Sequence, residues 1–252
     1  MKRALFIPDV QAGPGRPNRH LTWVGRYAAD KGFDPIIQAG DWGDYPSLSF
    51  FDKGKLVFEG RRLSKDWDAH RTSVDLFETE LAKAKGYKPR KVYTKGNHEF
   101  RIERAMNDSP GLDTLPNVTG YMQERGWETY EYLQVAKVEG VLFSHLFPRT
   151  LTGRVTNSSI KYGANSANHM VRANMASCVA GHKPGFDYAA VPGPGERKLH
   201  GLIAGSFYLH KETYAGPNSD INWKGVVVLN RLKAGSFDVC AVSIDYLRER
   251  YG

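Results

Sequence analysis

The stretch KVYTKGNHEFRIER, residues 91–104, joins a short apolar run to a compact polar group and then to a helical segment. Lys91–Thr94 is typical of a β-strand, and a short helix is expected at about Glu99–Met106. Between them, a glycine precedes Asn97 and His98, two side chains able to bind a metal or a phosphate. This order of strand, glycine and polar side chain is the basis for predicting both the fold and the function.

An apolar run followed by such a side chain occurs at four other places in the chain, two of them with a glycine between. Each time an apolar run ends and a metal-competent side chain follows closely. Together, the side chains that follow the five runs are Asp9, Asp41, Asn97 with His98, His145 and His182. A single aspartate after a strand usually caps a helix or a turn, and a single histidine is usually a surface or core residue. Five occurrences in one chain favour a shared site instead.

The chemistry of these side chains predicts a metal centre. Loops at the carboxyl ends of strands in α/β sheets converge, and ligands bind there. Gly40, Gly96 and Gly181 each precede a candidate ligand, and glycine lets the backbone turn sharply and approach closely. Aspartate, asparagine and histidine donors suit Mn, Fe, Ni or Zn better than Ca.

The wider pattern predicts an α/β protein. Strands are expected at 4–7, 35–39 and 91–94, and helices at 18–31, 63–85 and about 99–106. Further strands are expected at 132–138, 141–144, 177–180, 186–191, 199–204, 225–229 and 237–244, with a helix near 162–173. We therefore expect a four-layer α-β-β-α sandwich of two mixed sheets flanked by helices. It would be a single domain over residues 1–252, with an aromatic and basic insertion at about 45–62 and a loop-rich one at about 107–129.

The ordered motifs of the chain resemble those of the calcineurin-like metallophosphoesterases. The motifs that carry the resemblance are Asp9-Val10-Gln11, Gly40-Asp41-Trp42-Gly43-Asp44, Gly96-Asn97-His98-Glu99, His145 and Gly181-His182. The Gly-Asn-His-Glu block is the most specific of them. The chain length and the Asp-x-Gln motif also resemble phage-encoded members. The resemblance implies hydrolysis of phosphoester bonds by a metal-activated hydroxide.

The resemblance also implies a role for each matching residue. Asp41 would bridge two divalent metal ions, most suitably Mn. The second ion would be completed by Asn97, His145 and His182, and the first would be bound by Asp9 and Gln11. His98 would contact the substrate phosphate and act as general acid, while Asp44 and Glu99 would orient ligands. Arg101 would clamp a phosphate oxygen, unless it is an ordinary exposed helix arginine.

Two departures from the family pattern both affect the first metal. Gln11 stands where the family usually has histidine, and Pro184 stands where a second histidine usually ends the last motif. A glutamine carbonyl is a weaker ligand than imidazole for these metals, and proline offers no side-chain donor. The first site would then be weak or empty, or it would gain a ligand from His169, His210, Asp187 or water.

The charge of the chain favours an anionic partner. Its 252 residues carry a formal net charge of +8, which suits a nucleic acid, a nucleotide or another phosphate ester. Basic clusters at 61–62, 83–91 and 101–104 would track phosphates, or else form solvated helix faces. The aromatic residues Trp42, Tyr45, Phe50 and Phe51 would stack on bases, or else pack in the core.

These observations favour a phosphodiesterase or nuclease acting on nucleic acid or nucleotides. Alternatives are a phosphomonoesterase or protein phosphatase, and a degenerate, non-catalytic nucleic-acid-binding protein. The N-terminal apolar run is too short for a secretion signal, and no window is apolar enough to span a membrane. A cytoplasmic location, the host cytoplasm for a phage-encoded protein, is therefore expected.

Overall fold

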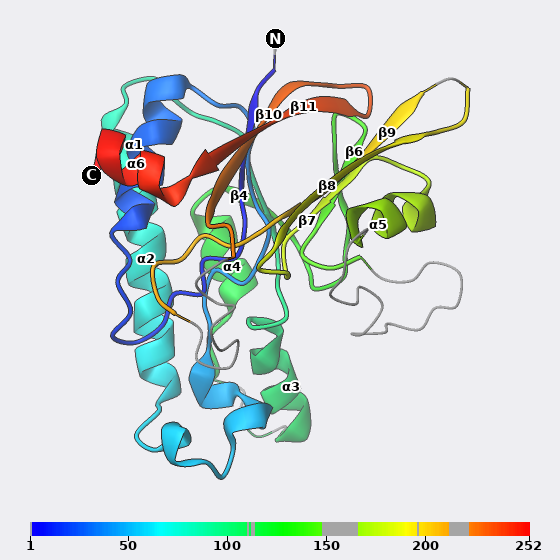
Figure 1. Cartoon of the computed structure of the whole chain (residues 1–252). Coiled ribbons are helices and arrows are strands. Elements are labelled where there is room, and N and C mark those ends of the chain that lie inside the picture. The colour runs from blue at the N-terminus through cyan, green and yellow to red at the C-terminus, as the bar shows by residue number, and fades with distance from the viewer. Residues whose placement is uncertain (1, 110, 112–113, 148–165, 196, 212–221) are drawn as a thin grey trace.

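Two mixed β-sheets pack face to face between helices (Figure 1). The computed structural model describes residues 2–109, 111, 114–147, 166–195, 197–211 and 222–252. The first sheet has the order β11-β10-β1-β2-β3-β4, and the second has the order β5-β6-β7-β9-β8. This arrangement confirms the predicted sandwich of two mixed sheets.

The first sheet is built around the N-terminal strand. Its strands are β1 (Ala4–Ile7), β2 (Ile36–Gln38), β3 (Lys91–Thr94), β4 (Trp127–Tyr130), β10 (Gly225–Lys233) and β11 (Ser236–Ser243). The strands β1 to β4 run parallel, whereas β10 and β11 pair antiparallel to their neighbours. Four buried residues in β1 match a central strand that is covered on both faces.

The second sheet has the same mixed character. Its strands are β5 (Ala136–Val138), β6 (Val141–Ser144), β7 (Cys178–Ala180), β8 (Phe186–Pro192) and β9 (Lys198–Ala204). The parallel strands β6, β7 and β9 lie between the antiparallel edge strands β5 and β8. As a result, the carboxyl ends of β6 and β7 lie at one edge of their sheet, like those of β1, β2 and β3 in the other.

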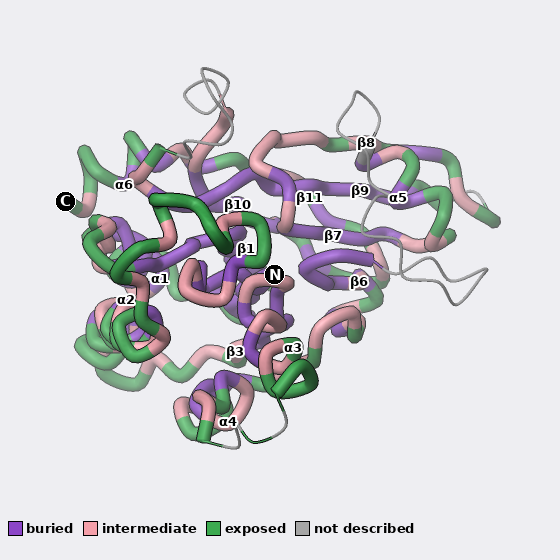
Figure 2. Tube along the Cα trace, turned by 90° about the horizontal axis from the view of Figure 1, so that it is seen from below, coloured by how far each residue is buried: buried purple, intermediate pink, exposed green. Residues whose placement is uncertain are grey.

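The alternation of side chains along β1 divides the core into layers. Phe6 points between the sheets, where it packs with Ile37 and Phe143. Leu5 and Ile7 point the other way, towards the helices α1 (His20–Lys31), α2 (Leu63–Lys83) and α6 (Ile244–Tyr251). The helix α5 (Ser166–Asn174) covers the outer face of the second sheet. Figure 2 shows these buried strands enclosed by partly exposed helices.

The expected insertions take two different forms. The segment 45–62 contains only three short 3₁₀ helices, at Pro46–Leu48, Phe50–Asp52 and Leu56–Phe58. The segment 107–129 is not loop-rich, because it contains α4 (Val118–Glu124) and most of β4, an integral strand of the first sheet. The helix α4 and the strand β4 were not predicted, because polar residues separate the few apolar ones, Val118, Met122 and Trp127, that pack in the core.

Other element boundaries differ little from the expected ones. The helix α3 (Phe100–Asp108) follows the Gly-Asn-His-Glu block as predicted. The expected strand at 132–138 is reduced to β5, and the chain after β11 forms α6, which the sequence pattern did not reveal. Ser243 caps α6 by accepting a hydrogen bond from the backbone N–H of Tyr246. In the described part of the chain, no helix combines the length and apolar character needed to cross a membrane.

Candidate metal centre

Four of the predicted ligands come together at the strand ends. The imidazole Nε2 of His145 and Nδ1 of His182 each lie 2.8 Å from Oδ1 of Asn97. The same His145 nitrogen lies 3.4 Å from Oδ2 of Asp41. The donor atoms of Asp41, His145 and His182 all lie within 4.8 Å of one another. Four residues from loops after β2, β3, β6 and β7 therefore face one small volume.

The hydrogen bonding of this cluster fits a cation. His145 donates its Nδ1 proton to the backbone carbonyl of Ala39, 2.9 Å away, so its Nε2 presents a lone pair to Asn97. Burial lowers the pKa of His145, although the Asp41 carboxylate opposes this, and the ring is therefore held neutral. Two acceptor atoms 2.8 Å apart beside a carboxylate form an arrangement that a shared positive charge stabilises.

Asp9 lies next to this group from the end of β1. Its Oδ1 accepts a hydrogen bond from the backbone N–H of His182 at 2.9 Å and lies 3.8 Å from Nδ1 of His145. Burial raises the pKa of Asp9 well above its usual range, and the nearby Asp41 raises it further. The site thus concentrates buried negative charge, which a divalent ion would offset.

Gln11 is tied to the centre through its backbone. Its N–H donates to the carbonyl oxygen of Asp41 at 2.8 Å, and its own carbonyl accepts from Arg16 at 2.9 Å. The side chain is buried. Gln11, Asp41 and His182 all adopt positive φ, at 48°, 50° and 70°. Such backbone strain is typical of residues held for function.

The three replacement ligands considered from the sequence do not join the cluster. Within the described residues, the group of His, Cys, Asp and Glu donors close enough to share a metal consists of Asp41, His145 and His182. Asp187 accepts a hydrogen bond from the backbone N–H of Ala167, at the start of α5. His169 lies on α5, and His210 stacks on Tyr208 with ring centroids 4.3 Å apart. Among the described residues, the donors that are close enough to share a metal therefore gather around Asn97 rather than around Gln11.

Glu99 holds the loops that carry the ligands. One carboxylate oxygen, Oε2, accepts from the backbone N–H groups of Asp41 and Gly96, both at 3.0 Å, and Oε1 accepts from Gly43 at 2.9 Å. Burial raises the pKa of Glu99 to about 7, and the charge of Asp41 contributes to the rise. A single buried carboxylate thus fastens the loop after β2 to the loop after β3.

Gly96 shows why glycine is required at this junction. A Cβ at this position would collide with the side chain and backbone of Asp41. The close approach allows the backbone N–H of His98 to donate to Oδ1 of Asp41 at 2.9 Å. The Gly-Asn-His-Glu block and Asp41 therefore form one interlocked unit.

His98 lies beside the cluster and is oriented by Asp44. Its Nδ1 donates to Oδ1 of Asp44 at 2.6 Å, and its Nε2 lies 3.6 Å from Oδ2 of Asp41. Burial lowers the pKa of His98, but the Asp41 and Asp44 carboxylates outweigh it, so the net pKa is raised. The ring therefore presents Nε2 towards the centre with its other nitrogen fixed.

Asp44 is itself held by two arginines. Arg16 forms an ion pair with its Oδ2 at 2.7 Å, and Arg101 lies 3.6 Å from its Oδ1. Burial raises the pKa of Asp44, but the His98 hydrogen bond and the two arginines hold it well below its usual range. Arg101 also donates to the backbone carbonyl of Asp44 at 2.7 Å, so it is not a freely exposed helix arginine. The contact of Arg16 with Asp44 was not anticipated, because no local motif marks it.

The geometry agrees with an independent comparison of sequences. A sequence profile of the calcineurin-like phosphoesterases matches residues 2–167, more than half of the chain. The chain belongs to the calcineurin-like phosphoesterase family. Members bind two divalent metal ions and act on phosphoesters. The matched range includes Asp9, Asp41, Asn97 and His145, whereas His182 lies beyond it and is brought to the centre by β7. Among curated proteins, no sequence matches the chain.

Proposed function

We propose that this family member is a metal-dependent phosphodiesterase or nuclease that acts on nucleic acid or nucleotides. The observation that carries the proposal is the close approach of Asp41, Asn97, His145 and His182, with His98 oriented beside them. A metal cluster by itself would serve many reactions. A histidine aimed at the same volume and fixed through its second nitrogen is what hydrolysis of an ester with a poor leaving group requires.

The proposed ligand sets differ in strength. Asp41, Asn97, His145 and His182 would hold one divalent ion, and Asp41 would share a second with Asp9 and Gln11. Their mixture of carboxylate, amide and imidazole donors suits Mn most closely, with Fe, Ni and Zn also compatible. When bound, such ions lower the pKa of water and offset charge on the phosphoryl oxygens.

The remaining steps belong to side chains of the chain itself. Nε2 of His98 would donate a proton to the leaving oxygen, while Asp44 keeps the ring in the correct orientation and offsets its charge. Glu99 would keep the loops after β2 and β3 in register. Arg101, on the first turn of α3, would attract the substrate phosphate or stabilise Asp44 beside it.

A diester is favoured over a monoester by the surroundings of His98. Arg101, which contacts Asp44, also lines a pocket with basic and aromatic side chains, which suits the further phosphates and bases of a diester strand beyond the scissile phosphate. A phosphomonoesterase or protein phosphatase is the alternative within the family. The sparse donors near Gln11 favour a third possibility, a non-catalytic nucleic-acid-binding protein. The fixed His98–Asp44 pair argues against it, because binding alone needs no proton donor.

Two finer expectations accompany this proposal. The Asp9-Val10-Gln11 motif supports a phage-type member. A phage-type member would act in the host cytoplasm.

Hydrolysis of two small chromogenic esters tests the proposal. Bis(4-nitrophenyl) phosphate and 4-nitrophenyl phosphate would be compared after chelation and after readdition of Mn, Fe, Ni or Zn. We expect metal-dependent turnover with a higher kcat/KM for the diester. A higher kcat/KM for the monoester would identify a phosphomonoesterase, and no turnover of either ester with any metal would support the non-catalytic alternative.

A further inference from the structure

The fold separates the aromatic residues after Asp41 into two pairs. Trp42 and Tyr45 are fully buried, so they pack in the core and are not available to stack on a ligand. Phe50 and Phe51 are 77% and 79% exposed, and their ring centroids lie 6.3 Å apart. Exposing two adjacent phenylalanine rings costs stability, so a role outside the core is the simplest explanation for them.

The basic side chains differ in whether their charge is already paired within the protein. Lys83, Arg90 and Lys91 pair with glutamates, and Arg61 is fixed by Asp52 and by the carbonyl of Pro46. Arg104, by contrast, is exposed and forms no ion pair with any residue that the structure describes. Arg104 therefore has charge available to an external partner, as do the exposed Lys85 and Lys88 of the cluster at 83–91. Arg104 differs from these two lysines in lying on the same helix as Arg101, which contacts Asp44 beside the metal centre.

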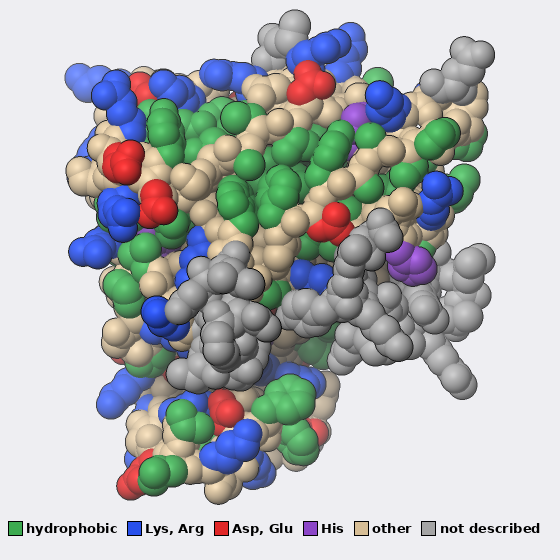
Figure 3. Space-filling model, viewed as in Figure 1, with side chains coloured by type: hydrophobic (Ala, Val, Ile, Leu, Met, Phe, Trp, Pro, Cys, Tyr) green, Lys and Arg blue, Asp and Glu red, His purple; other side chains and the backbone are tan. Residues whose placement is uncertain are grey.

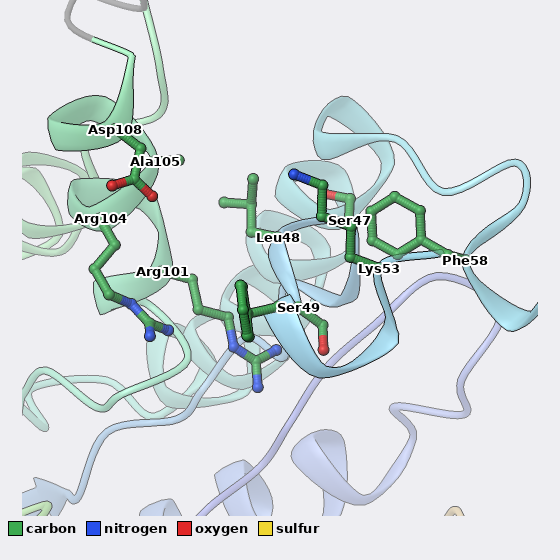
Figure 4. A pocket seen from close by; sticks show the side chains of 10 residues that line it. Ser47, Leu48, Ser49, Lys53, Phe58, Arg101, Arg104, Ala105 and Asp108 are labelled. Carbon is green, nitrogen blue, oxygen red and sulfur yellow. The ribbon is translucent and has the colours of Figure 1, made fainter. Parts of the chain in front are cut away.

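Phe50 and the basic side chains of α3 line one pocket of about 260 Å³, whereas Phe51 is not among its lining residues. It lies between α3 and the segment 45–62, and six of its lining residues are Ser49, Phe50, Lys53, Phe58, Arg101 and Arg104. Arg101 and Arg104, one turn apart on α3, extend their guanidinium groups to the same side, while Asp108 lies farther along the helix (Figure 4). The lobe at the bottom of Figure 3 shows hydrophobic and basic side chains next to each other.

Arg101 connects this pocket to the metal centre. It lines the pocket and donates from Nη1 to the carbonyl oxygen of Asp44, whose carboxylate holds His98. The pocket therefore adjoins the side of the centre on which His98 lies. That is the side from which a leaving group departs if His98 protonates it.

We infer that this pocket binds the leaving-group side of a single-stranded nucleic acid. The inference rests on the proposed phosphodiesterase function and specifies its substrate. Arg104 and Lys53 contact phosphates beyond the scissile one, and Phe50 stacks on an unpaired base, as aromatic side chains do in proteins that bind single strands. A duplex keeps its bases stacked on each other, so it offers the rings no free base face.

Steady-state kinetics on matched substrates tests the inference in the full-length, metal-loaded protein. The substrates are a fluorescent oligothymidylate, its RNA counterpart, the same DNA strand with abasic sites, a duplex and bis(4-nitrophenyl) phosphate. The variants are Phe50→Ala and Arg104→Gln, which both change residues that line the pocket. Their controls are Leu56→Ala, an exposed apolar residue of the same segment, and Lys85→Gln, an exposed basic residue elsewhere.

We expect Phe50→Ala to raise KM for the unmodified strand about 5- to 150-fold, the range of one lost base stack. On the abasic strand this increase should disappear. Arg104→Gln should make the dependence of log KM on log salt shallower by about 0.7, the value for one phosphate contact on a single strand. Neither control should change KM for the strand by more than about twofold, and the duplex should be the poorer substrate.

Several results would overturn the inference while leaving the proposed function intact. These are turnover of the small diester without cleavage of either strand, equal KM values for strand and duplex, or unchanged KM in both Phe50→Ala and Arg104→Gln. An equal effect of Leu56→Ala would instead indicate that the apolar segment docks on a protein. If the wild-type protein cleaves no diester with any metal, the proposed function and the inference both fail. The DNA and RNA strands separately report which sugar the pocket accepts.

Discussion

The two halves of the candidate metal centre differ in how many chain-distant side chains they bring together. The half around Asn97 combines donors from loops after four strands, with separations of 2.8 to 3.4 Å. The half around Gln11 has Asp9 and the shared Asp41, and Gln11 itself is tied in through backbone hydrogen bonds. On the proposed function, this difference predicts that one ion is bound tightly and that a second is bound more weakly.

Asp41→Asn is expected to have the largest effect, because Asp41 is shared by both halves. An amide removes the negative charge between them, so metal content should fall at both positions. Hydrolysis of the small diester should fall on the order of a thousandfold, since bound metals contribute several kcal/mol to the transition state. Elemental analysis and kcat/KM measure the two effects, with the exposed Asp68→Asn as the control. A variant that retains both metals would show that Asp41 does not bridge the halves.

His98→Ala should separate chemistry from metal binding. His98 contacts Asp41 and Asp44 but belongs to neither ligand set, so metal content should match that of the wild type. Turnover should fall by roughly a hundredfold or more, the usual contribution of a general acid. Unchanged kcat with the small diester would remove His98 from the mechanism, and a parallel loss of metal would reassign it as a ligand.

Glu99→Gln tests whether the two loops depend on one carboxylate. Glutamine would place an NH₂ group against a backbone N–H that now donates to Glu99, so the free energy of unfolding should fall by about 1–3 kcal/mol. Metal affinity should weaken by about 10- to 100-fold, as when residues behind the ligands are changed. Denaturant unfolding and metal titration measure these effects, and the exposed Glu124→Gln should change neither. Normal metal affinity would mean that the loops hold their positions without Glu99.

Gln11→His should have the smallest effect and should strengthen the weaker half. Imidazole is a better ligand than an amide carbonyl for these metals, and histidine tolerates the left-handed backbone at this position. We expect the second equivalent of metal to bind about tenfold more tightly, or about 1.4 kcal/mol. Calorimetric titration of the metal-free protein would resolve the two binding events. Equal affinities for both equivalents in the wild-type protein would contradict the asymmetry on which this prediction rests.

The part of the site that could be predicted is the part encoded locally. Asp9, Asp41, His145 and His182 each follow a short apolar run within a few residues, and strands in such sheets end at a common edge. The Gly-Asn-His-Glu block added the family and the approximate roles. The strand β4 and the helix α4 were hidden, because their apolar positions are too few to show a period and are explained only by the neighbours they pack against.

Contacts between distant loops could not be predicted. Nothing near Asp44 in the sequence indicates that Arg16 and Arg101 would hold its carboxylate, or that Glu99 would accept hydrogen bonds from three backbone N–H groups. The burial of the aromatic residues could not be predicted either. Tyr45 and Phe50 lie five positions apart and look equivalent in the sequence, yet one is fully buried and the other is largely exposed.

By itself, the sequence determined the family, which side chains could bind metal, and the order along the chain of the strands that carry them. These properties depend on residue type and on short spacings. Tertiary structure decided which of those side chains meet and how many donor side chains each half of the centre contains. It also decided which aromatic and basic residues remain exposed to a substrate. Proximity and burial arise only when segments tens of residues apart pack together, and that packing depends on the whole core rather than on any one motif.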